Sequence, residues 1–296
     1  LEVVKKLDVD VTGDEETLDI FFIDKETEPN ARTIYNMKPA NTELGKAPHF
    51  KANALKAAAT LIQSGDFAIL VDIKKAFYHL WMALWSRRMC RFAVRSSSCQ
   101  IELYEWNGMP MGLNSAPYWW RRVLRPVLAL LRRQHVRVVD NTDDLLVLGS
   151  THNECAINAQ HVINTLIFFG FTISTKTDLT PSQTFTFNGL RYNTTSMTVS
   201  LPDDKIKSIV AMAHNVLHAD RATSKRQQLT VRQLLSLVGK LEFCRHAVPS
   251  TPLWTRELRR ALPRQPAPPT TSSSSTSATT SSSASASTSS RSSSTS

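Results

Sequence analysis

The sequence has few cysteines, no long apolar run and no glycine-rich phosphate-binding loop, and each absence excludes a class of protein. Its four cysteines, at positions 90, 99, 155 and 244, are far apart and include no Cys-x-x-Cys pair. This spacing argues against a zinc site or a disulfide framework and is typical of reduced core residues. No signal peptide and no apolar stretch of membrane-spanning length is present, so we expect an intracellular protein without a membrane partner.

Large apolar and charged residues are nearly absent from the C-terminal segment 263–296, which is almost entirely Ser, Thr, Ala and Pro. Such a composition cannot offset the entropy lost on ordering, so we expect a disordered tail. Residues 1–262 remain, which is enough for a large core. The formal net charge is +10, and the only charged residues in the tail are Arg264 and Arg291, so the folded part carries most of the excess positive charge. A basic folded part predicts a nucleic-acid partner, although a merely soluble basic protein would have the same composition.

Hydrophobic patterning predicts an α+β fold. Short apolar stretches between turn residues predict strands, and they cover 19–23, 32–37, 67–73, 91–95, 100–106, 136–139, 145–148, 171–174, 184–190 and 197–200. Helical spacing predicts helices, over 50–63, from a Ser115 cap to about 133, and after capping boxes at Thr151 and Thr230. The pattern becomes purely helical near residue 201, which predicts a boundary between 1–200 and a helical region 201–262.

Paired carboxylates stand at the tip of a predicted hairpin. The polar run Asn141–Asp144 separates the apolar stretches 136–139 and 145–148. Adjacent carboxylates repel each other unless a cation is present, and Mg²⁺ is commonly held by one or two carboxylates. Asp72 ends another buried apolar strand and would be the second half of a two-metal site. Taken alone, a pair such as Asp143-Asp144 is more often an ordinary acidic turn.

Five segments resemble, in order and spacing, the motifs of reverse transcriptases. Residues 68–80 are similar to the first catalytic motif, 109–117 to the second, and 141–144 stand where the family has its Tyr-x-Asp-Asp hairpin; 169–176 and 185–190 resemble the next two. The resemblance covers roughly residues 30–260. Segments 197–205 and 229–241 look most like retrotransposons of the tyrosine-recombinase (DIRS-like) class. Because the chain starts at Leu1 without a methionine, we expect a segment of a longer polyprotein.

The resemblance implies a right-hand polymerase. Fingers and palm, an antiparallel sheet backed by helices, would occupy residues 1–200, and a helical thumb-like region would occupy 201–262. The implied activity is RNA-directed DNA synthesis, in which a deoxynucleotide (dNTP) is added to a primer 3′ end on an RNA or DNA template. Two Mg²⁺ or Mn²⁺ ions, about 4 Å apart, would stabilise the attacking and leaving oxygens.

The resemblance also implies roles for individual residues. Asp72, Asp143 and Asp144 would be the catalytic, metal-binding carboxylates, whose convergence from two strands the chemistry requires. Lys176 stands where the family has a lysine proposed to protonate the leaving pyrophosphate. A plain surface lysine at this position is an equally good interpretation.

Three residues would bind the incoming nucleotide. Arg32 matches the arginine of the fingers that clamps the triphosphate, for which a guanidinium fork is suited. Phe77, five residues after Asp72, would exclude a ribose 2′-hydroxyl, and Gly112 would let the backbone approach the nucleotide closely. The alternatives are a solvated strand charge for Arg32 and a core aromatic for Phe77.

Basic residues follow the second motif. Arg121, Arg125 and Arg132 fall near one face of the predicted helix and could track the template backbone, although each alone is more often a solvated charge.

Three residues depart from the family pattern. Asn141 replaces a tyrosine, Lys75 replaces an acid, and Asn188 interrupts an apolar motif. No presumed metal ligand is lost. Besides an active polymerase, two interpretations therefore stay open: a catalytically degenerate remnant that only binds nucleic acid, and an RNA-synthesising palm polymerase, against which Phe77 argues.

Overall fold

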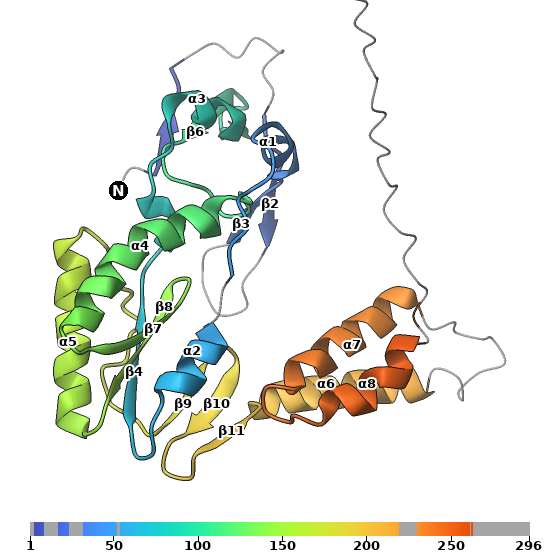
Figure 1. The fold of residues 1–296 in the computed structure, drawn as a ribbon. Helices are drawn as coiled ribbons and strands as arrows, with labels where there is room; N and C mark the ends of the chain where they lie inside the picture. The colour runs from blue at the N-terminus through green and yellow to red at the C-terminus, as the bar shows by residue number, and fades with distance from the viewer. Residues whose placement is uncertain are drawn as a thin grey trace, which may run out of the picture.

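The computed structural model describes residues 3–8, 17–23, 32–51, 54–218, 230–260 and 262. The predicted tail, 263–296, lies outside these residues. The described chain alternates strands and helices as far as Ser200 and continues only as helices, so the α+β class predicted from the sequence is confirmed (Figure 1). Among the described residues, no helix is both long and apolar enough to cross a membrane.

The central sheet contains the apolar strands that precede and follow the paired carboxylates. It is antiparallel with the order β4-β8-β7, formed by β4 (Phe67–Asp72), β8 (Asp144–Gly149) and β7 (Arg137–Asn141). The register places Asp72 opposite Asp144 and Asn141 opposite Asp144. The acidic ends of β4 and β8 therefore lie side by side.

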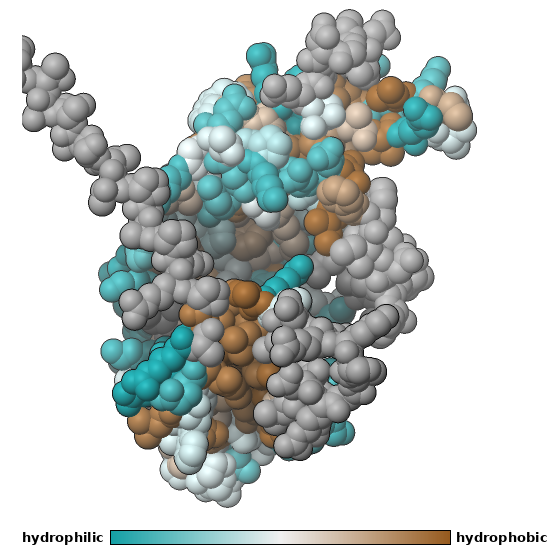
Figure 2. Space-filling view, turned by 90° about the vertical axis from the view of Figure 1, so that its right-hand side faces the viewer, coloured by the Kyte–Doolittle hydropathy of each residue, from teal (hydrophilic) through white to brown (hydrophobic). Residues whose placement is uncertain are grey.

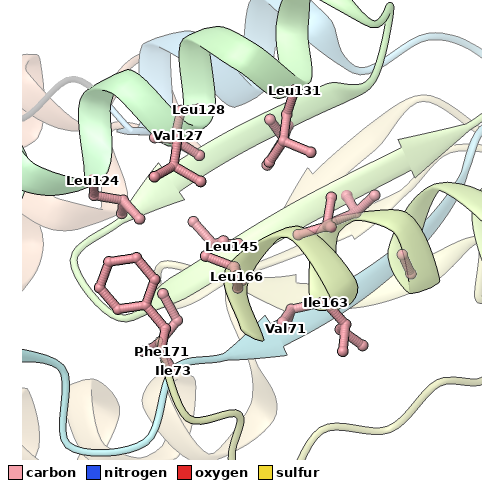
Figure 3. Packing of buried hydrophobic residues seen from close by; sticks show 14 of the residues in the cluster. Val71, Ile73, Leu124, Val127, Leu128, Leu131, Leu145, Ile163, Leu166 and Phe171 are labelled. Carbon is pink, nitrogen blue, oxygen red and sulfur yellow. The ribbon is translucent and has the colours of Figure 1, made fainter. Parts of the chain in front are cut away.

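Both faces of this sheet are buried, which explains why β4 and β8 are apolar at nearly every position. Helices α4 (Ala116–Arg133) and α5 (His152–Phe168) cover one face, where Leu145 packs among side chains from both helices (Figure 3). Helix α2 (Ala54–Leu61) and the hairpin β9 (Thr184–Phe187)–β10 (Leu190–Asn193) pack on the other. Alternate residues of β8 accordingly belong to two different cores.

A second group of strands forms the upper part of the molecule in Figure 1. A sheet of order β1-β6-β5 is formed by β1 (Val4–Lys6), β6 (Ile101–Trp106) and β5 (Arg91–Arg95). Strands β2 (Ile20–Ile23) and β3 (Arg32–Tyr35) pair beside it. The short helical elements here are α1 (Lys38–Glu43), η1 (Ala76–His79), α3 (Leu84–Arg87) and η2 (Arg88–Cys90).

The expected single strand over 184–190 is wrong, because the chain turns at Asn188-Gly189. Their φ angles are 48° and 75°, and Leu190 pairs with Phe187 across the turn. Two successive positive φ values define the type I′ hairpin turn, for which Asn-Gly is the preferred sequence. The residue that interrupts the apolar motif is therefore explained by turn geometry.

Three other local predictions need correction. Segment 171–174 is no strand and makes one isolated bridge, between Ile173 and Ile73. Ser115 accepts no capping hydrogen bond, since its backbone is helical (φ −84°, ψ −13°) instead of extended as in a capping residue. The Thr151 hydroxyl accepts from the Glu154 N–H, but the Glu154 carboxylate accepts from the Ser150 N–H, so that box is not reciprocal. The capping box at Thr230 is complete.

Helices α6 (Asp203–His218), α7 (Val231–Cys244) and α8 (Thr251–Arg260) follow β11 (Thr198–Ser200) and lie to one side of the central sheet (Figure 1). The Lys205 ammonium donates to the Gly189 carbonyl at 3.1 Å and lies 4.6 Å from the centre of the Phe243 ring. Seen from the side of these helices, the described surface is hollowed between an upper part and a lower part rich in apolar side chains (Figure 2).

Candidate active site

The paired carboxylates stand at a turn with an uncommon backbone. Thr142 and Asp143 connect β7 to β8, and Thr142 has a φ of 61°. A β-branched residue in this left-handed region is strained by roughly 1–3 kcal/mol, and such strain is concentrated at functional sites. The Trp120 indole Nε1 donates a hydrogen bond of 2.5 Å to the Thr142 carbonyl, so a side chain of α4 supports the strained residue.

Asp72 is brought to the same place by strand pairing. It lies opposite Asp144 in the β4–β8 register, and side chains at directly opposite positions have Cβ atoms roughly 5 Å apart on one face of the sheet. The next backbone N–H, that of Ile73, donates to the Asp143 carbonyl at 2.9 Å. The sheet therefore brings Asp72 beside the Asp143-Asp144 pair, although about 70 residues separate them in the sequence.

Mutual repulsion and burial shape the electrostatics of this cluster. Burial raises the pKa of Asp143, and the charge of Asp72 adds to the rise. Burial, Asp143 and Asp72 together raise the pKa of Asp144 to about 6. No ion pair among the described residues includes any of the three. The cluster thus concentrates negative charge, and no basic side chain of the described residues is paired to it.

The donor chemistry of the cluster suits a hard divalent cation, because carboxylate oxygens are the preferred ligands of Mg²⁺ and like charges brought together favour a cation between them. Within the described part of the chain, however, no three His, Cys, Asp or Glu side chains are grouped so as to hold a metal ion. The assignment of Asp72, Asp143 and Asp144 as metal ligands therefore stays a prediction.

Without metal, the cluster should make stability depend on pH. An aspartate titrates near pH 4 when unfolded, so the folded state holds an extra proton on Asp144 between about pH 4 and pH 6. Stability then decreases as the pH rises through this window. Asp144→Asn should raise the melting temperature at pH 8 by about 1–3 °C and flatten its fall above pH 4. Asp204→Asn, on exposed helix α6, is the control; an equal response of both variants would contradict the assignment.

Lys176 lies beside the backbone of Asp72. The Ser174 N–H donates to the Asp72 carbonyl at 2.8 Å, and the Asp72 N–H donates to the Thr177 hydroxyl at 3.2 Å. Lys176, between these two partners, is exposed. The segment that resembles the fourth motif is therefore attached to the first, and the role of Lys176 in proton transfer stays a prediction.

The predicted nucleotide-binding residues lie on three different elements. Phe77, in η1, is half-buried and contacts Trp120 edge to face, with ring centres 6.4 Å apart. Gly112 has a φ of 96°, and its carbonyl accepts from the Asn41 amide at 3.0 Å, which ties the loop to α1. Arg32 begins β3, but its side chain lies outside the described part of the structure.

The three arginines of α4 have different surroundings. Arg121 lines a narrow crevice beside the acidic turn, with Trp120 and Thr142 among its neighbours. Arg125 is exposed. Arg132 donates to the Val138 carbonyl at 3.0 Å and pairs with Asp140 at 3.3 Å. Arg132 therefore joins the end of α4 to β7, and a template track along this face of the helix stays a prediction.

Two of the departures from the family pattern contact each other. The Asn141 amide lies 3.4 Å from the Asn188 amide oxygen, which links the acidic hairpin to the β9–β10 turn. The third, Lys75, is exposed and has a left-handed φ of 55°. Neither the Asn141–Asn188 contact nor the Trp120–Thr142 bond could be predicted from the sequence, because both join segments that are distant in the chain. The Asn-Gly pair at 188–189 is a known hairpin signal and could have indicated the turn that places Asn188.

Comparison with known proteins agrees with this geometry. The family model described as "Reverse transcriptase (RNA-dependent DNA polymerase)" matches residues 25–192, more than half of the chain. The chain belongs to this family. The Gag-Pol polyprotein of Rous sarcoma virus subgroup B (strain Schmidt-Ruppin) is 26% identical over 157 residues, which are 52% of this chain and 10% of the relative. The Gag-Pol polyprotein of Avian leukosis virus subgroup A (isolate RSA) matches with the same identity and coverage. The reverse transcriptase chain thus spans about a tenth of these curated relatives.

Solved structures of reverse transcriptases share the fold. The foamy viral protease-reverse transcriptase in complex with dsDNA has a TM-score of 0.63 at 17% identity, covering 86% of this chain and 48% of that one. The same foamy viral protein in complex with an RNA/DNA hybrid has a TM-score of 0.58 at 16% identity, covering 83% of this chain and 30% of that one. The predicted polymerase fold is confirmed.

Proposed function

We propose that this reverse transcriptase chain is an RNA-directed DNA polymerase that adds deoxynucleotides to a primer 3′ end. The observation that carries the proposal is the meeting of Asp72, Asp143 and Asp144 at one edge of the central sheet, with no basic side chain of the described residues paired to them. Membership of the family supports the reaction type. No observation favours the degenerate alternative.

The three carboxylates would hold two Mg²⁺ or Mn²⁺ ions, which when bound supply charge stabilisation to the attacking and leaving oxygens. The protein's own part is to hold the carboxylate ligands in fixed positions. β4 fixes Asp72 and the turn fixes Asp143, so the ligands come from rigid elements. Lys176 would hold a proton for the pyrophosphate as it leaves.

Substrate selection would depend on the surroundings of the carboxylates. Phe77 would exclude a ribose 2′-hydroxyl, Gly112 would allow close approach of the backbone, and Arg32 would bind the triphosphate. The template and primer would follow the basic face of α4 at Arg121 and Arg125. The foamy viral relatives were solved with dsDNA and with an RNA/DNA hybrid, which supports such a partner here.

Two finer assignments belong to the same proposal. Residues 1–200 would be fingers and palm, and 201–262 a thumb that holds the duplex. Within the reverse transcriptases, the segments 197–205 and 229–241 favour the tyrosine-recombinase class of retrotransposon. Longer relatives that carry a recombinase segment in the same open reading frame would support this placement.

The proposal is tested by primer extension on RNA and DNA templates with dNTPs and either Mg²⁺ or Mn²⁺. Extension on both templates that stops on chelation is expected. Primer–template binding without any extension in either metal would instead support the degenerate remnant.

Phe77→Ala should relax the choice of sugar. Removing the ring opens the space that a 2′-hydroxyl needs, so incorporation of ribonucleotides relative to deoxynucleotides should increase roughly 10- to 100-fold. Single-nucleotide kcat/KM ratios measure this change independently of any general loss of activity. Phe77→Tyr, which keeps the ring, should leave the ratio within about twofold of wild type, and an unchanged ratio in Phe77→Ala would exclude the gate.

A further inference from the structure

We propose that Trp120 is a positioning residue for the polymerase reaction, because its indole N–H fixes the peptide that precedes Asp143. This inference rests on the function proposed above and assigns a role to a residue that the sequence motifs leave as packing.

The Trp120 ring is itself held in one place. The side chain is 1% exposed and belongs to the core between α4 and the central sheet. Phe171 contacts it edge to face at 5.5 Å, and Phe77 does so at 6.4 Å with the ring planes at 87°. An aromatic ring enclosed on these sides has a single orientation, so its N–H points at a fixed place.

That place is the Thr142 carbonyl oxygen, 2.5 Å away. This oxygen belongs to the peptide plane between Thr142 and Asp143. The next plane is held as well, since the Asp143 carbonyl accepts from the Ile73 N–H at 2.9 Å. Fixing both planes fixes the φ and ψ of Asp143 and therefore the direction in which its carboxylate leaves the backbone.

The turn needs such support. Thr142 has a φ of 61°, which a β-branched residue avoids. Asp72 lies opposite Asp144 in the strand register and Asp143 directly precedes Asp144, so like charges meet at the end of the turn and repel each other. Strain and repulsion both act to open the turn, and the Trp120 bond opposes them.

The same ring joins the carboxylates to the residue proposed to select the sugar. Phe77 contacts, in an edge-to-face arrangement, the indole that holds the turn. A displaced indole would therefore change the distance between the sugar-selecting side chain and the metal-binding turn. Misplacement of reacting groups by about 1 Å can reduce rates roughly 100-fold.

Trp120→Phe tests the proposal, because it keeps an aromatic ring and removes only the N–H donor. Trp119→Phe is the matched control: the adjacent indole is 45% exposed. Replacement of Trp120 by benzothienylalanine, which keeps the full bicyclic shape without the N–H, serves if the phenylalanine variant does not fold. Melting temperatures establish which variants are folded.

The affinity of the protein–primer–template complex for Mn²⁺, measured by electron paramagnetic resonance, gives a readout that does not need activity. Loss of the N–H should weaken Mn²⁺ binding by about tenfold, and should lower kcat roughly 10- to 100-fold while the KM for dNTP changes less than about threefold. The Trp119→Phe variant should match wild type in all three quantities.

A rescue separates positioning from general destabilisation. Asparagine tolerates the left-handed region far better than threonine, so Thr142→Asn in the Trp120→Phe background should recover severalfold of the lost Mn²⁺ affinity. Wild-type Mn²⁺ affinity and kcat in the folded N–H-deficient variants would overturn the positioning role. A wild-type chain that binds Mn²⁺ but extends no primer would overturn the proposed function instead, and the two failures are thereby distinguished.

Discussion

Replacing Asp143 with asparagine is expected to reduce primer extension by at least about 10³-fold. The amide keeps the size of the side chain but removes the negative charge that the turn presents next to the paired positions of Asp72 and Asp144. Electrostatic stabilisation at the reacting centre is usually the largest contribution to catalysis, so among isosteric changes only those at the other two carboxylates, Asp72 and Asp144, are expected to have comparable effects.

The same hairpin offers a matched control. Asp140→Asn makes the identical chemical change three residues earlier, at a side chain that pairs with Arg132 at 3.3 Å. Its extension rate should stay within about fivefold of wild type, because an ion pair with an exposed arginine contributes little. Because burial and Asp72 raise the pKa of Asp143, Asp143→Asn should not lower the melting temperature. Equal extension by wild type and Asp143→Asn would remove the polymerase hypothesis.

The largest effect on stability is expected at Arg137, which forms a bidentate ion pair with Asp66. The two guanidinium nitrogens lie 2.6 and 2.7 Å from the carboxylate oxygens, and the Asp66 side chain is only 2% exposed. The same guanidinium donates to the Leu61 carbonyl at the end of α2 and to the Ser150 hydroxyl after β8. This pair connects the starts of β4 and β7 to a helix and a loop.

Arg137→Met should lower the free energy of unfolding by about 3–5 kcal/mol, because it leaves a buried carboxylate without a partner. Thermal unfolding should show a loss of roughly 10 °C. The double variant Asp66→Leu/Arg137→Met should be more stable than Arg137→Met alone, since no charge is then left unpaired.

Arg260→Met is the control for this pair. It breaks an exposed pair with Glu257 and should cost less than about 1 kcal/mol. A loss in Arg137→Met no larger than in Arg260→Met would show that the buried pair does not stabilise the fold.

The elements of the central sheet could be predicted because each is determined by residues close in sequence. The continuous apolar stretch before Asp72 predicts a strand buried on both faces, and the four polar residues 141–144 between two apolar runs predict a hairpin. Both predictions are confirmed. By contrast, β1 was not predicted, because its three residues form a strand by pairing with β6, where Val4 faces Trp106.

The candidate site could be predicted as a set of residues but not as a geometry. The acids Asp72, Asp143 and Asp144 follow from motif order. The bond from Trp120 to Thr142 depends on how α4 packs on the sheet, which no local pattern encodes. The positive φ of Thr142 could not be predicted either, because a β-branched residue argues against that conformation. When a residue adopts a backbone conformation that its own type disfavours, the conformation is determined by tertiary contacts, which a local sequence pattern does not show.

The contacts of Lys205 link the C-terminal helices to the acidic hairpin through the β9–β10 turn. Only Leu201 and Pro202 separate β11 from α6, and the Lys205 ammonium joins the Gly189 carbonyl to the Phe243 ring. From Gly189 the path continues through Asn188 to Asn141. A small rotation of α6 about its two-residue connector would therefore move the Gly189 carbonyl and, through Asn188, the Asn141 side chain. Asn141 directly precedes Thr142, the strained residue of the acidic turn.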